Sequence, residues 1–169
     1  MTIEIDDAGT GDILYGTVIG AYRPEDDHFI YDMIDVTHFQ MPKYKNKSHL
    51  EEAKRIAVEL VERLELKEKE KIIICTGDVL NVAAEALIEK FGEDVVVRGK
   101  IEGRGQHLVE LAFTDELRNI GYEPLAERTE KWGKNFWDMY KWINKKPKRR
   151  LKFAKSAFPN LKKYPLFQR

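Results

Sequence analysis

The sequence of 169 residues contains one cysteine, Cys75, so it has neither an internal disulfide nor a zinc site built from several cysteines. No run of about 18 apolar residues occurs, which excludes a membrane-spanning helix. The first residues lack the basic and apolar segments of a signal peptide. The four histidines show no zinc-site spacing, and neither a Walker A motif nor a dinucleotide-binding glycine pattern is present. We therefore expect a cytoplasmic protein without membrane contact.

The whole chain also has no net charge, but its basic and acidic residues are concentrated in different segments. Residues 131–169 contain thirteen Lys and Arg against one acid, Asp138, whereas the other 130 residues contain 16 basic and 28 acidic residues. A basic segment of this kind predicts contact with nucleic-acid phosphates. A solvated basic face, or a segment folded back on its own acidic body, is the alternative. The candidate nucleic-acid-binding residues here are Lys145, Lys146, Lys148, Arg149 and Arg150.

With 43% apolar residues the chain is expected to be globular, and its periodicity predicts three strands followed by alternating helices and strands. The first three strands should form an antiparallel meander, and the last two a parallel pair joined by a helix. Ser48 and Glu51 match a capping box, with Ser48 as the N-cap of the first helix. A domain at 1–125 and a basic, aromatic extension at 126–169 are expected. Predicted strands cover 3–7, 14–23, 28–39, 71–75 and 94–101, and predicted helices 48–66, 81–91, 106–117 and 132–142.

The first strand ends in Asp6-Asp7-Ala8-Gly9-Thr10-Gly11, which resembles the D-E-A-G-R-G signature of type 2 ribonucleases H at four of six positions. The following segment, 17–21, is also similar to the small-apolar strand of that family. The order of predicted elements resembles the ribonuclease H-like superfamily. This resemblance implies an α/β fold, with a ribonuclease H-like five-stranded mixed sheet (three antiparallel strands, then two parallel strands) and flanking helices.

The resemblance further implies a metal-dependent nuclease that cleaves a phosphodiester with Mg²⁺ or Mn²⁺ held by carboxylates from separate elements. Asp6 matches the family's first-strand aspartate. Asp7 is the second candidate, with capping of the following turn as its alternative. Asp78 resembles the S-T-D strand ending of type 1 ribonucleases H, displaced by one residue, and a plain turn or cap is its alternative.

Helical acids should complete the cluster. On the first helix Glu52 is the candidate, because Glu51 is assigned to the capping box, although an ordinary exposed glutamate is the alternative. On the third helix Glu110 is the candidate, with His107 one turn earlier as a ligand or proton shuttle, unless that histidine is structural. The predicted catalytic residues are Asp6, Asp7, Glu52, Asp78, Glu110 and His107; the predicted metal ligands are Asp6, Asp78 and Glu110, with Glu102 and Asp115 in reserve.

The glycine-rich turn of Gly9, Thr10 and Gly11 is expected to approach the sugar-phosphate backbone, as the resemblance implies. Thr10 stands in place of the family's arginine, so we expect a weak preference for a ribonucleotide embedded in DNA. The expected partner is RNA, DNA or a hybrid, and a homodimer is among the assemblies considered. Two alternatives stay open: a non-catalytic nucleic-acid-binding or assembly protein that retains the fold, and a junction resolvase-like or transposase-like nuclease.

Overall fold

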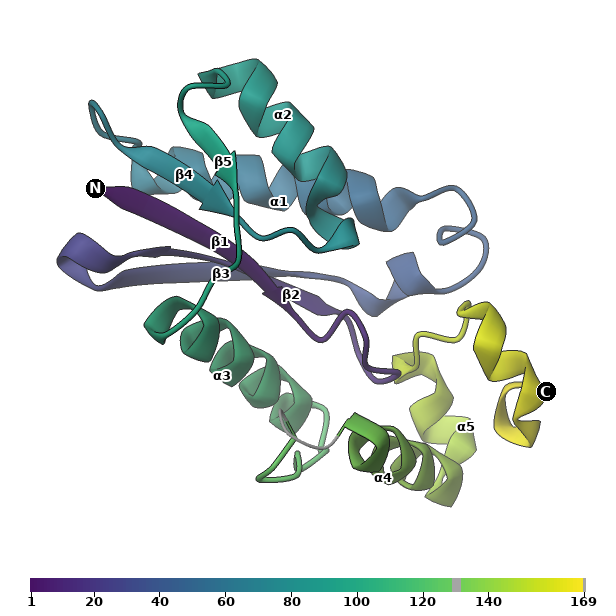
Figure 1. Ribbon diagram of the computed structural model, residues 1–169. Coiled ribbons are helices and arrows are strands. Elements are labelled where there is room, and N and C mark those ends of the chain that lie inside the picture. The colour runs from purple at the N-terminus through teal and green to yellow at the C-terminus, as the bar shows by residue number, and fades with distance from the viewer. Residues whose placement is uncertain (129–131, 169) are drawn as a thin grey trace.

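The computed structural model describes residues 1–128 and 132–168. It confirms the predicted α/β fold: a five-stranded mixed sheet in the order β3-β2-β1-β4-β5, with helices on both faces (Figure 1). The strands are β1 (Thr2–Ala8), β2 (Thr17–Arg23), β3 (His28–Ile34), β4 (Lys71–Ile74) and β5 (Val96–Arg98), and the α-helices are α1 (Ser48–Leu64), α2 (Asn81–Phe91), α3 (Arg104–Asn119), α4 (Trp132–Lys145) and α5 (Pro147–Arg150).

The central strand β1 is the element on which the site depends. It pairs antiparallel with β2, where Asp6 lies opposite Gly20, and parallel with β4, where Ile5 lies opposite Ile74. β2 pairs antiparallel with β3, and β4 pairs parallel with β5, as predicted. Because β1 and β4 are parallel, their carboxyl ends meet at the same edge of the sheet.

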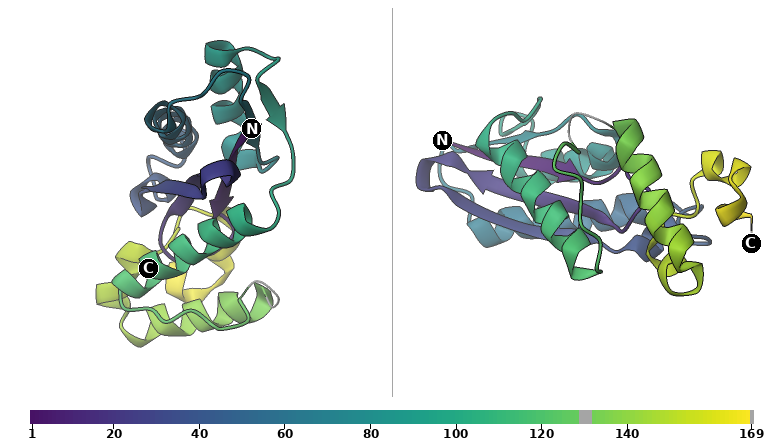
Figure 2. Two further views of the ribbon diagram at one scale, coloured as in Figure 1. Left: turned by 90° about the vertical axis from the view of Figure 1, so that its left-hand side faces the viewer. Right: turned by 90° about the horizontal axis from the view of Figure 1, so that it is seen from below.

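Alternation along β1 divides its side chains between two cores, which lie on opposite faces of the sheet (Figure 2). Ile3 and Ile5 pack with α1 and α2. Ala8 packs on the other face with α3, α4 and residues that follow α5. The second core contains Ala8, Leu14, Val18, Val109, Phe113, Leu117, Met139, Ile143, Ala154, Leu161 and Leu166.

The four predicted helices are present, but three have different limits: α1 ends at Leu64 instead of 66, α3 covers Arg104–Asn119 instead of 106–117, and α4 continues to Lys145 instead of 142. α2 has the predicted limits and stops at Gly92, whose φ of +99° a residue with a side chain rarely adopts. The predicted capping box is wrong. Ser48 is the first helical residue and Lys47 is the N-cap, without a side-chain cap. The Ser48 hydroxyl instead donates to the Lys43 carbonyl and contacts His38 Nδ1, so tertiary contacts displace the local motif.

Four predicted strands are shorter than expected, although β4 differs by one residue only and ends at Ile74. β2 begins at Thr17, because Leu14 forms an isolated antiparallel bridge with Ala154. β3 ends at Ile34, and Val36–Phe39 forms a 3-10 turn that the Asp35 side chain caps. β5 covers only Val96–Arg98. After α5 the chain forms short 3-10 turns (Leu151–Phe153, Pro159–Lys163 and Pro165–Phe167).

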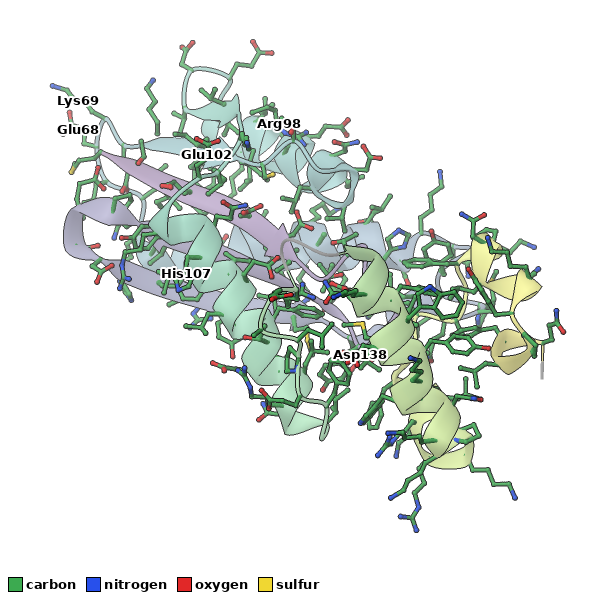
Figure 3. The ribbon with its side chains drawn as sticks, turned by 60° about the horizontal axis from the view of Figure 1, so that its bottom comes forward. Glu68, Lys69, Arg98, Glu102, His107 and Asp138 are labelled. Carbon is green, nitrogen blue, oxygen red and sulfur yellow. The ribbon has the colours of Figure 1, made fainter. Side chains whose placement is uncertain are left out.

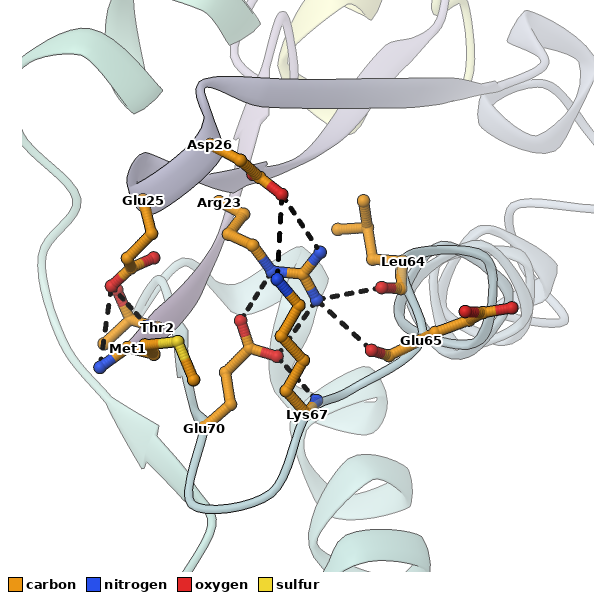
Figure 4. Close-up of polar contacts among 9 residues, drawn as sticks. All are labelled: Met1, Thr2, Arg23, Glu25, Asp26, Leu64, Glu65, Lys67 and Glu70. Atoms are coloured by element: carbon orange, nitrogen blue, oxygen red, sulfur yellow. Dashed lines mark hydrogen bonds and ion pairs between the residues drawn. The ribbon is translucent and has the colours of Figure 1, made fainter.

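A buried ion pair closes the end of the sheet opposite the site. Arg23 donates through Nε to Glu70 Oε1 at 2.6 Å and through Nη2 to the Leu64 carbonyl at 2.8 Å (Figure 4). The backbone N–H of Lys67 donates to the second Glu70 oxygen at 2.8 Å. Arg23 therefore satisfies a carbonyl at the C-terminus of α1, which no intrahelical bond can reach. Among the residues described, no helix combines the length and apolarity that crossing a membrane requires.

Candidate carboxylate site

Asp6 and Asp7 lie at the end of β1 and come from its two faces. The backbone N–H of Asp7 donates to Asp6 Oδ1 at 2.9 Å, and the Thr10 hydroxyl donates to Asp7 Oδ2 at 2.6 Å. Asp6 is buried, and burial raises its pKa to about 6, against lowering hydrogen bonds from the Asp7 backbone and from Cys75. The sequence therefore places two carboxylates side by side where the strand stops.

Cys75 is the third member of this group. Its backbone N–H donates to the Ile5 carbonyl at 2.9 Å, which continues the parallel β1–β4 pairing past Ile74 and brings Cys75 beside Asp6. One ligand atom from each of Asp6, Asp7 and Cys75 lies within 4.8 Å of the others. Burial, followed by the nearby Asp6 charge, raises the pKa of the thiol, so it is neutral at pH 7. In the sequence Cys75 served only to exclude a disulfide and a cysteine zinc site; the parallel pairing of its strand with β1 was the signal that could have found it.

Asp78, the predicted partner of Asp6, is outside the Asp6–Asp7–Cys75 group. It is exposed and begins the 3-10 turn Asp78–Leu80. The intervening loop is held by Arg98, which donates to the carbonyls of Cys75 and Gly77 at 2.8 and 3.3 Å. Figure 3 shows Arg98 near Glu102, which forms an ion pair with Lys100 and is exposed.

Glu110 reaches the site from α3. Burial is the largest influence on the Glu110 pKa and raises it. The charges of Asp12 and Asp7 also raise this pKa, whereas Arg128 lowers it. The negative charge of Glu110 also raises the pKa of Asp6. Arg128 pairs with Glu110 Oε2 at 3.1 Å and with Asp12 Oδ2 at 3.0 Å, and its guanidinium lies 5.0 Å from the centre of the Phe113 ring.

Asp12 and Arg128 lie beside the candidate site and were not predicted from the sequence. They are 116 positions apart, and no short-range pattern pairs a turn residue with an arginine beyond α3. Both side chains are almost fully buried, with 4% and 5% exposed. The pair places a positive charge next to Glu110, so that this carboxylate is already neutralised within the protein.

The other predicted catalytic residues lie apart from the Asp6–Asp7–Cys75 group. Glu52 on α1 accepts three hydrogen bonds from Arg55, which lowers its pKa. His107 is exposed on α3 (Figure 3) and lines, with Glu110 and Arg128, a hollow of about 340 Å³. Asp115 pairs with Arg118. Of the predicted helical acids, Glu110 is therefore the one adjacent to the strand-end aspartates.

The glycine-rich turn fits closely against α3. Gly9 has a φ of +91°, and a Cβ at this position would lie 2.3 Å from the Phe113 ring, so a side chain has no room. The Asp12 backbone N–H donates to the Gly9 carbonyl at 3.1 Å, which closes the turn. A Cβ at Gly11 would meet nothing within 4 Å. The open side of the turn is thus at Gly11, and the Thr10 hydroxyl is committed to Asp7.

The predicted phosphate-binding residues gather at the end of α4 and on α5. Lys145, Lys146, Lys148 and Arg149 are exposed, and Arg150 stacks on Trp142 at 4.0 Å from the ring centre. A concavity of about 540 Å³, here called the basic hollow, is lined by Ile120, Gly121, Trp142, Lys146, Lys148, Arg149, Arg150, Lys152 and Phe153. Within the described part of the chain, no ion pair joins these cations to an acid of the body.

Comparisons with models of protein families, with curated proteins and with solved structures give no match to this chain. The molecule is defined by its own features: an α/β protein with the sheet order β3-β2-β1-β4-β5, a partly buried acidic group at the carboxyl ends of β1 and β4, and an exposed basic hollow.

Proposed function

We propose that this protein is a metal-dependent nuclease of the ribonuclease H-like superfamily, acting on a nucleic-acid phosphodiester. The observation that carries the proposal is the Asp6–Asp7–Cys75 group, whose ligand atoms lie within 4.8 Å of one another. No ion pair among the described residues gives Asp6 or Asp7 a basic partner. Two adjacent carboxylates, of which Asp6 is buried and Asp7 half-buried, repel each other, and a divalent cation removes that cost.

The residues present fit one divalent ion better than two. Asp6 and Asp7 supply the oxygen ligands that Mg²⁺ and Mn²⁺ require. Of these two ions, Mn²⁺ is the softer and would accept the Cys75 sulfur more readily, provided that the ion displaces the thiol proton. Glu110, the natural ligand for a second ion, is paired with Arg128. A bound ion would lower the pKa of a water molecule and neutralise charge on a phosphodiester oxygen. His107, exposed on the hollow beside Glu110, is the proposed proton shuttle.

The ion pair between Glu110 and Arg128 also favours a second candidate function. A protein of this fold that binds nucleic acid without cleaving it has no need of a free acid on α3. In that case the Asp12–Arg128–Glu110 contacts are structural, and the basic hollow is the functional surface.

The first prediction tests the metal site by calorimetry with Mn²⁺. Asp6→Asn should weaken Mn²⁺ binding by more than tenfold, because it removes a charged ligand from the group. Asp78→Asn is the matched control and should bind as the wild type does, because Asp78 is exposed and outside the group. At 100-fold excess over the wild-type Kd, Mn²⁺ should raise wild-type stability by about 2.7 kcal/mol, and at the same Mn²⁺ concentration the gain in Asp6→Asn should be about 1.4 kcal/mol or less.

Cleavage of labelled RNA, DNA and hybrid substrates in Mn²⁺ then separates the two candidate functions. Cleavage that Asp6→Asn abolishes supports the nuclease. Nucleic-acid binding without cleavage by the wild type supports the non-catalytic candidate. Equal Mn²⁺ binding by the wild type and Asp6→Asn contradicts the proposed metal site.

The second prediction concerns the basic hollow. Truncation is unsuitable as a test, because Ala154, Leu161 and Leu166 belong to the second core. The double variant Lys148→Gln/Arg149→Gln should instead reduce the slope of log affinity against log salt by about 2 on duplex DNA, since each lost phosphate contact removes about 0.9. The control Lys54→Gln/Lys100→Gln changes the net charge equally on side chains paired with Glu51 and Glu102. If both pairs change the slope alike, the hollow has no particular role.

A further inference from the structure

One face of α4 carries a row of exposed side chains that the carboxylate site does not use. Lys134, Trp137, Lys141 and Lys145 are spaced three or four residues apart, which places them on one side of the helix. All four are exposed, and Trp137 has 48% of its surface accessible. From Lys134 to Lys145 the row extends about 16 Å along the helix axis.

Trp137 is held firmly although it is exposed. Its ring lies 5.0 Å from that of Phe136 and 5.7 Å from that of Tyr164, both at near-perpendicular angles, and 5.6 Å from that of Tyr140. Edge-to-face contacts of this kind are favourable and restrict the indole to one orientation. A ligand that stacks on Trp137 therefore encounters a ring that is already ordered.

The surface around Trp137 is hollowed, and the hollow continues to the basic hollow. A concavity of about 320 Å³, lined by Leu125, Gly133, Lys134, Trp137, Asp138 and Lys141, is here called the tryptophan hollow. It shares Asp138 and Lys141 with a middle hollow of about 520 Å³, which in turn shares Gly121 and Trp142 with the basic hollow. The three hollows therefore adjoin one another from α4 to α5, and together they are here called the path.

The charge of this path favours a polyanion. Its two acids are engaged by other side chains, because Asp138 accepts a 2.6 Å hydrogen bond from Tyr122 and Glu123 pairs with Arg118. Figure 3 shows Asp138 on α4. The lysines have no such engagement among the ion pairs of the described residues. The cations along the path are Lys134, Lys141, Lys145, Lys146, Lys148, Arg149, Arg150 and Lys152.

We infer that this path binds a single-stranded nucleic acid, with one base stacked on Trp137 and the flanking phosphates against Lys134 and Lys141. An aromatic platform between cations is the arrangement that binds unpaired bases, because every base has a stacking face and paired bases in a duplex keep theirs covered. The strand then continues through the middle hollow into the basic hollow. This inference rests on the nucleic-acid part of the proposed function and not on cleavage.

Fluorescence anisotropy in EDTA, with a labelled 12-nucleotide oligothymidylate and a duplex of equal length, tests the inference without cleavage. Trp137→Ala should weaken single-strand binding about tenfold and duplex binding less than twofold, and Trp137→Phe should recover part of the loss. Tyr31→Ala, at another exposed aromatic on β3, is the matched control and should leave both affinities unchanged. Circular dichroism melting of each variant checks that the fold is retained.

The failure of this inference differs from the failure of the proposed nuclease. The stacking platform is overturned if Trp137→Ala binds the oligothymidylate as tightly as the wild type does. It is also overturned if the variant loses the same affinity for single strand and duplex. Neither result bears on metal-dependent cleavage. If Trp137→Ala shows the predicted loss of single-strand affinity but the protein binds no Mn²⁺, the platform is supported and the proposed nuclease is contradicted. Absence of any wild-type binding to either nucleic acid overturns the platform.

Discussion

Replacing Arg128 with methionine is expected to lower the free energy of unfolding by about 3–5 kcal/mol at neutral pH, the range typical for breaking a buried ion pair. The side chain is 5% exposed and pairs with Asp12, which is 4% exposed, and with Glu110, which is 22% exposed. Methionine fills much of the volume but leaves both carboxylates without the positive charge. Urea unfolding at pH 7 measures the loss.

Arg118→Met is the matched control for that experiment. Arg118 also pairs with two carboxylates, Asp115 and Glu123, but it is 44% exposed, so its removal should cost less than about 1 kcal/mol. The deficit of Arg128→Met should also shrink as the pH falls. Without Arg128, burial raises the pKa of Glu110 unopposed, and protonation of this group then relieves the cost in the folded state. Equal losses in the two variants would contradict the buried network.

Lys155→Met should have a large effect of the opposite sign and stabilise the protein at pH 7 and below. Lys155 is fully buried, its Nζ lies 3.3 Å from the Leu14 carbonyl, and the Phe39 and Phe113 rings are within 6 Å of it. Burial lowers its pKa from 10.5 to about 7, against the raising effect of Asp12, and Arg128 lowers it further. Methionine retains the apolar stem and removes the ammonium group.

The Lys155 pKa of 10.5 in the unfolded chain and about 7 in the folded protein sets how stability changes with pH. Between pH 7 and pH 10.5 the unfolded chain keeps the Lys155 proton and the folded protein has released it, so the contribution of this group to stability rises with pH. The slope is about 1.4 kcal/mol per pH unit above pH 7. Lys155→Met should remove this slope in urea unfolding between pH 6 and pH 9, and the exposed Lys152→Met should not. Parallel wild-type and Lys155→Met curves would refute the buried lysine's role.

The parts of the fold that the sequence predicted are those in which a local pattern and the tertiary structure agree. α2 combines apolar periodicity with a stop at Gly92, and both limits match the structure. The central β4 reads as a continuous apolar run because helices and neighbouring strands cover it. The capping box at Ser48 failed because His38 and the Lys43 carbonyl compete for the same hydroxyl.

The site was harder to predict because its contacts join distant parts of the chain. Asp6 and Asp7 were found from one motif, but Cys75 joins them through strand pairing, and Arg128 reaches Asp12 from beyond α3. Lys155 reads as one more charge of a basic segment. Its burial depends on Leu14 and Phe113, which no pattern around residue 155 reveals.

The two cores can form at different times while the chain is being synthesised. The core beneath α1 and α2 draws its fully buried residues from positions 3 to 96, so it can assemble while the rest of the chain is still being translated. The core beneath α3 needs Ala154, Leu161 and Leu166, which pack with Ala8, Leu14 and Val18. α3 can cover part of this side of β1 and β2 earlier, but until the ribosome has released the later residues the second core stays incomplete and partly open to solvent and to chaperones. The segment after the glycine-rich turn bonds to these later residues, because the Ile13 carbonyl accepts from the Lys155 N–H and the Tyr15 N–H donates to the Phe153 carbonyl. A nascent chain can therefore complete the core beneath α1 and α2 before this side of the candidate site is in place.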